Sequence, residues 1–408
     1  MLRALSAAVS GLRTNQSELD VIGNNIANVN TVGFKASQTE FADLLNQTIA
    51  GEQAPSGNVG GKDPMQVGLG TTLAGIRTLF TQGIIQSTNN PSDLAIQGEG
   101  FFVLRNGTNT LYTRAGAFTL DASGTLVDSA SGLRVQGALG DITIAPGSML
   151  AGSATTTETF GGNLDAARAE GEQHVATFSV NDSLGSPHTL ALTFTKNFTA
   201  ASGRWDYAVT TTDAAITGLT GNTGSVTFDT SGAVTGTTTS SLVITFAAAS
   251  GAATSQTVTL DFGSANNTTP LTGNAGTSTA RLAGQDGYPA GTLLQWSIGA
   301  DGSINAAYDN GRSAVLDRIQ LATFDNPGGL LHTGQNMFMA SANSGIARFS
   351  DPGTGGAGAL LPGALEGSNV DLARQFTDLI TAQRGFEASA RVIRVGDDIL
   401  QTVVNIKQ

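Results

Sequence analysis

The stretch VDLARQFTDLITAQRGFEASARVIRVGDDILQTVVNI, residues 370–406, carries apolar side chains at a seven-residue interval that Leu365 begins. A heptad repeat of this kind places one apolar stripe along a long helix, as in the seam of a coiled coil. At about 1.5 Å per residue, the helix would extend roughly 55 Å. We expect it to begin at Ser368 or Asn369, with Asp371 in its first turn. The expected seam residues on this helix are Leu372, Phe376, Leu379, Phe386, Ile393 and Leu400.

The opposite end of the chain also predicts a long helix. Apolar residues recur there at spacings of three and four over residues 2–29, a length of roughly 40 Å. The simplest interpretation is a stalk in which the two terminal helices pair. Further apolar positions, such as Ile380 and Val395, would then need another neighbour, most economically a second copy of the chain. An ordinary intramolecular coiled coil or bundle is the alternative. The seam residues expected on the first helix are Leu5, Leu12, Leu19, Ile22, Ile26 and Val29.

Composition favours an extracellular structural protein over an enzyme. The 408 residues include 53 glycines and no cysteine, so disulfides and thiolate metal sites are excluded. The net charge is -12 and the 20 Lys and Arg residues form no cluster, which argues against a nucleic-acid or anionic-membrane surface. No apolar run resembles a secretory signal or reaches the ~20 residues of a membrane span. These features predict a cytoplasmic chain or one exported without signal cleavage.

Between the helices the sequence predicts β structure in nested pieces. Short alternating segments separated by Gly, Asn and Asp turns are typical of antiparallel β domains, while residues 34–49 fit a short helix or an irregular segment. The predicted fold is a multidomain α+β protein: a discontinuous terminal α-helical coiled-coil domain plus mainly antiparallel β domains, one inserted in the other. The expected parts are paired helices at 1–30 and 368–408, linkers at 31–70 and 353–367, a first β domain at 71–148 and 284–352, and an inserted outer β domain at 149–283.

Catalytic chemistry is not recognisable in this sequence. The histidines His174, His188 and His332 are scattered without metal-ligand spacing, and the first two fall in segments expected at the surface. The acids Asp397 and Asp398 are adjacent, so on a helix they point to different faces. We therefore expect no catalytic residues, cofactor or metal.

Several motifs resemble those of bacterial flagellar rod and hook proteins. They are LDVIGNNIAN (19–28) and TVGFK (31–35) near the start, GEGFF (98–102) in the first β segment, and SNVDLA (368–373) and QRGFEA (383–388) near the end. The resemblance covers roughly residues 1–140 and 285–408. One departure is Gln375, where relatives usually carry an acid. The motif residues are Asn24, Asn25, Asn28, Gly33, Phe34, Asn369, Asp371, Gln383 and Arg384.

The resemblance implies a structural subunit of a tubular polymer. Rod members are short, so the length and the large β insertion favour a hook subunit, a flexible universal joint that transmits torque from rod to filament. A distal rod subunit, or an extracellular β-rich adhesin or glycan-active enzyme with a coiled-coil stalk, are the alternatives. Implied partners are copies of the chain, the distal rod, hook cap and hook–filament junction proteins, and the flagellar type III export apparatus, with no nucleic acid and no membrane insertion. Asn24 and Asn25 are either solvated or hydrogen-bonded between helices.

Overall fold

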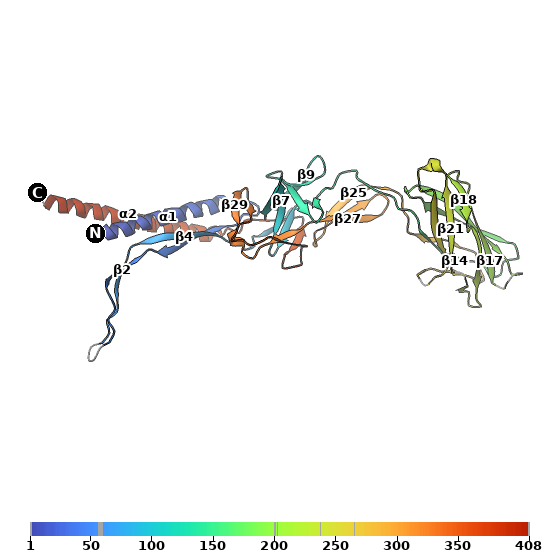
Figure 1. Cartoon of the computed structure of the whole chain (residues 1–408), viewed down its shortest axis with the longest axis horizontal. Coiled ribbons are helices and arrows are strands. Elements are labelled where there is room, and N and C mark those ends of the chain that lie inside the picture. The colour runs from blue at the N-terminus through green and yellow to red at the C-terminus, as the bar shows by residue number, and fades with distance from the viewer. Residues whose placement is uncertain are drawn as a thin grey trace. The chain divides into compact units, whose positions relative to one another are not determined.

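The computed structural model describes residues 2–55, 60–199, 201, 203–236, 238–264 and 266–406. In these residues the chain forms a helix near each end and is otherwise mostly β-sheet (Figure 1). It divides into two compact units. Unit 1 comprises Met1–Ala145, Trp296–Asn305 and Val315–Gln408, and unit 2 comprises Pro146–Gln295 and Ala306–Ala314. The predicted multidomain, mainly β architecture with terminal helices is therefore confirmed.

The helices of unit 1 are α1 (Leu2–Ala27) and α2 (Leu372–Ile406). Within the part of the chain that the structure describes, neither these nor any other helix is long and apolar enough to cross a bilayer. The expected start of α2 at Ser368 or Asn369 is wrong by three or four residues. Leu365, which continues the heptad interval, lies in a strand, because the chain up to Glu366 is held in β pairing with distant partners.

The segments expected to be linkers contain strands. Residues 34–49 form neither of the alternatives drawn from the sequence: β1 (Ser37–Asp43) pairs with β4 (Thr71–Thr78), and β2 (Asn46–Ala50) pairs with β3 (Met65–Gly68). Near the other end, β32 (Ala359–Pro362) pairs with β6 (Leu94–Gln97), and β33 (Ala364–Glu366) pairs with β5 (Ile85–Ser87). The partners of β32 and β33 are far apart in sequence and leave no local signal, whereas β2 and β3 pair locally and were missed because Gly and Pro are frequent between them.

A ten-stranded antiparallel sheet forms the β body of unit 1. Its core contains Phe101, Tyr112, Phe324 and Phe338, with the ring centroids of Phe101 and Phe338 5.7 Å apart. The strands are β7 (Phe101–Asn106), β8 (Asn109–Thr113), β9 (Phe118–Leu120), β10 (Leu126–Asp128), β11 (Arg134–Gly137), β12 (Gly140–Asp141), β28 (Leu321–Thr323), β29 (Leu331–Gly334), β30 (Met337–Met339) and β31 (Arg348–Ser350).

Unit 2 has a five-stranded and a six-stranded sheet that share one core around Trp205, Phe160 and Phe262. The first contains β15 (Gln173–Asn181), β16 (Pro187–Lys196), β17 (Arg204–Thr210), β19 (Thr223–Phe228) and β20 (Val234–Thr235). The second contains β14 (Thr157–Asn163), β18 (Ile216–Thr220), β21 (Thr239–Phe246), β22 (Ser255–Asp261), β23 (Leu271–Thr272) and β24 (Arg281–Gln285). The expected surface position of His188 is wrong: it is buried and contacts Asp182 and Asp213.

Four further strands complete the chain. They are β13 (Met149–Leu150), β25 (Gly291–Ile298), β26 (Ser303–Tyr308) and β27 (Ser313–Arg318). Three of the four sequence boundaries between the two units fall inside β25, β26 and β27, and the fourth lies between Ala145 and Pro146.

Candidate assembly surface

The helices α1 and α2 lie side by side and run antiparallel (Figure 1). A Cβ added to Gly396, near the end of α2, would lie 2.7 Å from Leu5 Cδ2, near the start of α1. Farther along, a Cβ on Gly385 would meet the Asn15 side chain at 3.0 Å. Ala382 is only 2% exposed. Small residues on α2 therefore permit a close helix–helix approach, a signal that a search for large apolar residues overlooks.

The expected seam residues occupy unequal positions. On α1, Ile22 is buried and the others are half-buried, with Val29 just past the end of the helix. On α2, Leu379, Phe386 and Ile393 are half-buried. The remaining three α2 seam residues are exposed: Leu372 (40%), Phe376 (52%) and Leu400 (36%).

The geometry of a straight helix explains this difference. A strict heptad drifts by about 20° per repeat relative to the 3.6-residue turn. Leu372 therefore falls at the edge of the face that contacts α1, two heptads before the half-buried Phe386. Leu400 is centred on that face, but it lies beyond Gly396, which already packs against Leu5. The part of α2 that contains Leu400 thus extends toward and past the start of α1.

Two motif asparagines fasten the helices to the strands. Asn25 is 1% exposed; its Oδ1 accepts from Ser37 N at 2.9 Å, and its Nδ2 donates to Ser37 O at 2.8 Å and to Gln375 Oε1 at 3.0 Å. Of the two alternatives for this residue, the hydrogen bond between helices is present. Asn369 accepts from Ala36 N at 2.7 Å and donates to Leu79 O at 2.7 Å. The two side chains join segments that are hundreds of residues apart in sequence.

Asp371 begins α2. Its Oδ1 accepts from Ala373 N at 2.9 Å and from Arg374 N at 3.2 Å, which satisfies two backbone donors that lack partners at a helix start. A carboxylate at this end also interacts favourably with the helix dipole. We expected Asp371 in the first turn of this helix, but it lies one residue before the helix begins.

A buried ionic cluster lies where the chain leaves α1. Lys35 Nζ is 2.6 Å from Glu366 Oε1, and Arg114 Nη1 is 3.4 Å from Glu366 Oε2. Lys35 also donates to Thr81 O, and Gly83 N donates to Glu366 Oε1, each at 2.8 Å. Burial lowers the pKa of Lys35, and the Glu366 carboxylate opposes that shift. The cluster ties together the N-terminal segment, the C-terminal segment and the β body.

Gly33 and Phe34 fit closely beside this cluster. Gly33 has φ +69, and a Cβ there would lie 2.5 Å from Ala115 N, so only glycine fits. Its N–H donates to Glu366 O at 2.8 Å. Phe34 is buried. The sequence indicated these residues only through the family motif, and Glu366 was not singled out.

The remaining motif residues lie at the surface or close to it. Asn28, half-buried, donates from Nδ2 to the backbone O of Asn24 at 2.9 Å and to its Oδ1 at 3.0 Å, so the exposed Asn24 helps to end α1 and does not join the two helices. Gln383 and Arg384 are exposed on α2.

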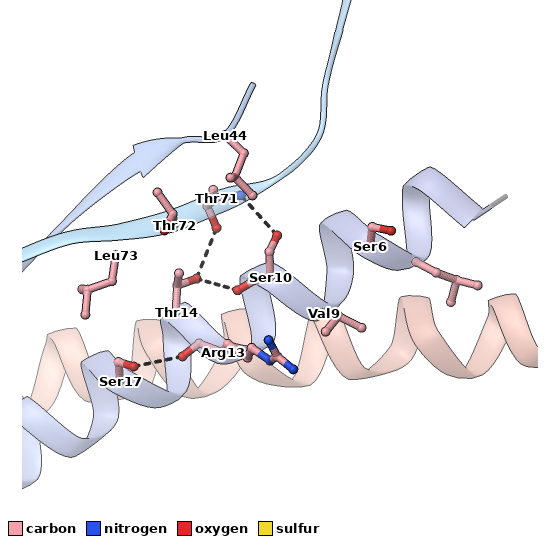
Figure 2. Close-up of a pocket in the computed structure, with 11 residues that line it drawn as sticks. Ser6, Val9, Ser10, Arg13, Thr14, Ser17, Leu44, Thr71, Thr72 and Leu73 are labelled. Atoms are coloured by element: carbon pink, nitrogen blue, oxygen red, sulfur yellow. Dashed lines mark hydrogen bonds between the residues drawn. The ribbon is translucent and has the colours of Figure 1, made fainter. Parts of the chain in front are cut away.

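A groove runs between α1 on one side and the start of β4 with Leu44, which follows β1, on the other (Figure 2). Its volume is about 620 Å³, and Val9 and Arg13 line it from the helix while Leu44 and Leu73 line it from the strand side. Ser10 Oγ accepts from Thr71 N at 3.2 Å, and Thr14 Oγ1 lies 3.2 Å from Thr71 Oγ1. Short hydroxyl side chains thus hold the strand against the helix and leave the groove open at its rim.

Metal-ligating side chains do not gather in the described ranges: no group of three or more His, Asp or Glu residues is placed to hold an ion. The prominent features of unit 1 are therefore apolar and hydrogen-bonding surfaces.

Family models match most of the chain. Residues 5–35 match the flagella basal body rod protein model, and residues 361–406 match the flagellar basal body rod FlgEFG protein C-terminal model. Residues 95–159 match the flagellar hook protein FlgE/F/G D1 domain, and residues 149–288 match the flagellar basal body protein FlaE D2 domain.

Individual relatives match over the whole length. The chain is 38% identical to the flagellar hook protein FlgE of Treponema pallidum and 37% identical to that of Borreliella burgdorferi, with 100% of each chain covered. It is 30% identical to the flagellar basal-body rod protein FlgG of Bacillus subtilis, again over 100% of both. Among solved structures, a Helicobacter pylori flagellar hook protein matches with a TM-score of 0.50 at 13% identity, covering 69% of this chain and 100% of that one.

Proposed function

The chain belongs to the flagellar hook protein family and is a structural subunit of the flagellar hook, and from this premise we propose that it polymerises through its paired terminal helices into a hollow helical tube. The helices would form the inner layer of the tube as a coiled-coil domain. Unit 2 would be the inserted outer domain, close to the expected range 149–283. The family is a structural one, so the proposal assigns no catalytic role to any residue.

The observation that carries the proposal is the apolar surface that the helix pair leaves uncovered. Phe376, Ile380, Val395 and Ile399 on α2 are each more than 40% exposed, and Leu400 is 36% exposed. Apolar surface of this extent on one helix marks a site for another protein surface. Contacts between different surfaces of identical subunits, repeated without closing, generate a helical filament.

The seam residues and the exposed motif residues acquire distinct roles in this proposal. The seam, Leu5 to Val29 on the first helix and Leu372 to Leu400 on the second, would hold the inner layer together within and between subunits. The motif residues Asn25, Gly33 and Asn369 would set the position of that layer relative to the β body of the same subunit. Gln383 and Arg384, exposed on α2, would face neighbouring subunits.

The hook bends while it rotates, so its inner contacts must persist while outer contacts slide. Two compact units in one chain suit this requirement, since each unit keeps its own core while bending of the strands that run through both would let one shift relative to the other. The proposed partners are copies of the chain, the distal rod, hook cap and hook–filament junction proteins. Export would proceed through the flagellar type III apparatus to the outside of the cell.

A distal rod subunit is the second candidate. The chain also matches a basal-body rod protein over its full length, at 30% identity, compared with 38% and 37% for the two hook proteins. Rod and hook differ in mechanics, because the rod is straight and rigid and the hook is curved and flexible.

Electron microscopy of the purified, polymerised protein tests the proposal and separates these candidates. We expect hollow tubes whose curvature changes with solution conditions. Straight tubes of constant form would favour the rod, and a protein that stays monomeric under all polymerising conditions would contradict both.

Replacing residues 152–283 with a short Gly/Ser linker should leave a protein that still forms tubes, with altered curvature. Monomers of that variant with a folded β body would show that unit 2 drives assembly.

A further inference from the structure

Two adjoining grooves form a concave strip along one side of α1. The groove of about 620 Å³ contains Arg13 and is followed by one of about 410 Å³ that contains Asp20. The two share Ser17 and Leu73. Figure 2 shows the first of them, with Ser17 and Arg13 on α1 and Leu73 on the facing strand. A strip with an apolar wall and a helix as its floor suits a second helix laid along it.

The outer side of α2 carries an apolar stripe that could lie along this strip. Its residues are Ala388, Val392, Val395 and Ile399, spaced by four, three and four, which places them on one helical face. Val392 is 46% exposed and Val395 is 51% exposed. The stripe lies beside the face that contacts α1, because Gly396, which packs against Leu5, is adjacent to Val392 and Ile399 on the helix surface, yet Val392, Val395 and Ile399 stay exposed. The chain's own α1 therefore does not cover it.

Charges beside the strip and the stripe occur at equal intervals. Arg13 and Asp20 are seven residues apart on α1, and so are Arg391 and Asp398 on α2. Seven residues correspond to about 10 Å along a helix. In both helices the arginine precedes the acid, so an antiparallel arrangement places each arginine opposite an acid. All four are exposed, and within the described ranges none takes part in an ion pair.

We propose that the strip along α1 of one copy receives the outer stripe of α2 from a second copy, antiparallel, with Arg13 opposite Asp398 and Asp20 opposite Arg391. This inference rests on the proposed function and names the contact through which the inner layer would grow. Each α1 then lies between its own α2 and the α2 of a neighbour. The two faces that α2 uses are different, so the contact repeats from copy to copy without closing.

Apolar burial and charge play different parts in this contact. Ion pairs at an exposed rim add little stability, whereas covering Val392, Val395 and Ile399 removes apolar surface from water. The charges select direction and register, because a parallel arrangement would place like charges together. Changing a charge should therefore weaken assembly without affecting the fold of either unit.

Charge reversal tests the register. Arg13→Glu and Asp398→Lys should each raise, at least several-fold, the protein concentration at which tubes sediment, and the double variant should restore most of the loss. Asp397→Lys is the matched control, because Asp397 bears the same charge about 100° around the helix. That variant should polymerise normally and should not rescue Arg13→Glu. Normal polymerisation of Arg13→Glu would overturn the proposal. Equal rescue of Arg13→Glu by Asp398→Lys and by Asp397→Lys would overturn it as well.

Crosslinking tests whether α2 of a second copy occupies the strip along α1. The chain has no cysteine, so introduced cysteines are the only thiols. A Ser17→Cys chain copolymerised with a differently tagged Val395→Cys chain should give covalent heterodimers on oxidation, and a Val175→Cys chain in place of the latter should not. Homodimers of Ser17→Cys alone, or copolymers without heterodimers, would contradict the contact. Failure of the wild type to polymerise would instead refute the proposed function, and the inference with it.

Discussion

Lys35 and Glu366, 331 residues apart in sequence, lie with Nζ and Oε1 2.6 Å from each other and with both side chains fully buried. Arg114 contacts the second oxygen of the same carboxylate. Burying three charged groups is costly unless each is paired and hydrogen-bonded, as these are. The relationship makes the docking of each chain end to the β body depend on the other end.

Removing Glu366 should therefore destabilise unit 1. In Glu366→Gln the buried Lys35 and Arg114 lose their anionic partner, and breaking a buried pair costs about 3–5 kcal/mol. Calorimetry should show an earlier unfolding transition for unit 1 with the transition of unit 2 unchanged. Glu40→Gln is the control, because the Glu40–Arg77 pair is exposed and should contribute at most about 1 kcal/mol. An unaltered unit 1 transition in Glu366→Gln would contradict the role assigned to the buried ionic cluster.

Replacing Asn25 should loosen the helices. Asn25→Ala leaves the N–H and C=O of Ser37 and the Gln375 side chain without this partner, and an unsatisfied buried polar group costs roughly 1–3 kcal/mol. We expect faster proteolytic cleavage within α1. The neighbouring exposed residue provides the control, Asn24→Ala, which should be cleaved at close to the wild-type rate. Equal rates for the two variants would refute the role assigned to Asn25.

A charge in the seam should prevent assembly without unfolding the β domains. Leu379→Asp or Phe386→Asp would place an unpaired carboxylate in the helix contact, a cost of several kcal/mol. Sedimentation should show no polymer, and calorimetry should show an unchanged unit 2. Val175→Asp, an exposed position in unit 2, is the control for an added charge. Normal hooks made from either seam variant would contradict the seam assignment.

Unit 2 should lose stability as pH rises toward 8. Burial and the nearby Asp286 raise the pKa of Glu158 from 4.5 to about 8. The folded state therefore retains a proton that the unfolded state releases. The stability linked to this proton is complete below about pH 4.5 and falls by up to about 1.4 kcal/mol per pH unit until the pH passes about 8.

The melting temperature of unit 2, measured from pH 5 to pH 9, checks this expectation. Glu158→Gln keeps the shape of the side chain and removes the titrating group, so its melting temperature should be much less sensitive to pH in that range. A wild-type profile as flat as that of Glu158→Gln would show that Glu158 is ionised in the folded protein.

The terminal helices and the family could be predicted from the sequence because their signals are local and repeated. Heptad spacing identified α2 to within a few residues, and short motifs indicated Asn25, Gly33 and Asn369. The ionic cluster could not be predicted in this way. Glu366 lies in a short strand and Arg114 directly follows one, both with ordinary composition, and only long-range strand pairing brings them to Lys35. The strands in residues 31–70 were missed for a different reason, because glycine, proline and asparagine are frequent around them.

The helix contact illustrates a second limit. Large apolar residues every seven positions identified the helix, but the residues that pack closest to α1 include Ala382, Gly385 and Gly396. Small residues have no distinctive hydrophobic signal, and their role appears only when the partner helix is in place. Phe376 was expected in the seam and is instead exposed, because a 3.6-residue turn rotates it away from α1.

The radial position of the terminal helices in the assembled polymer tests the central claim most directly. An electron cryomicroscopy map of tubes formed by the purified protein should show α1 and α2 lining the central channel, with each α1 between two α2 helices and unit 2 at larger radius. A map with the helices on the outside, or with unit 2 lining the channel, would contradict the account.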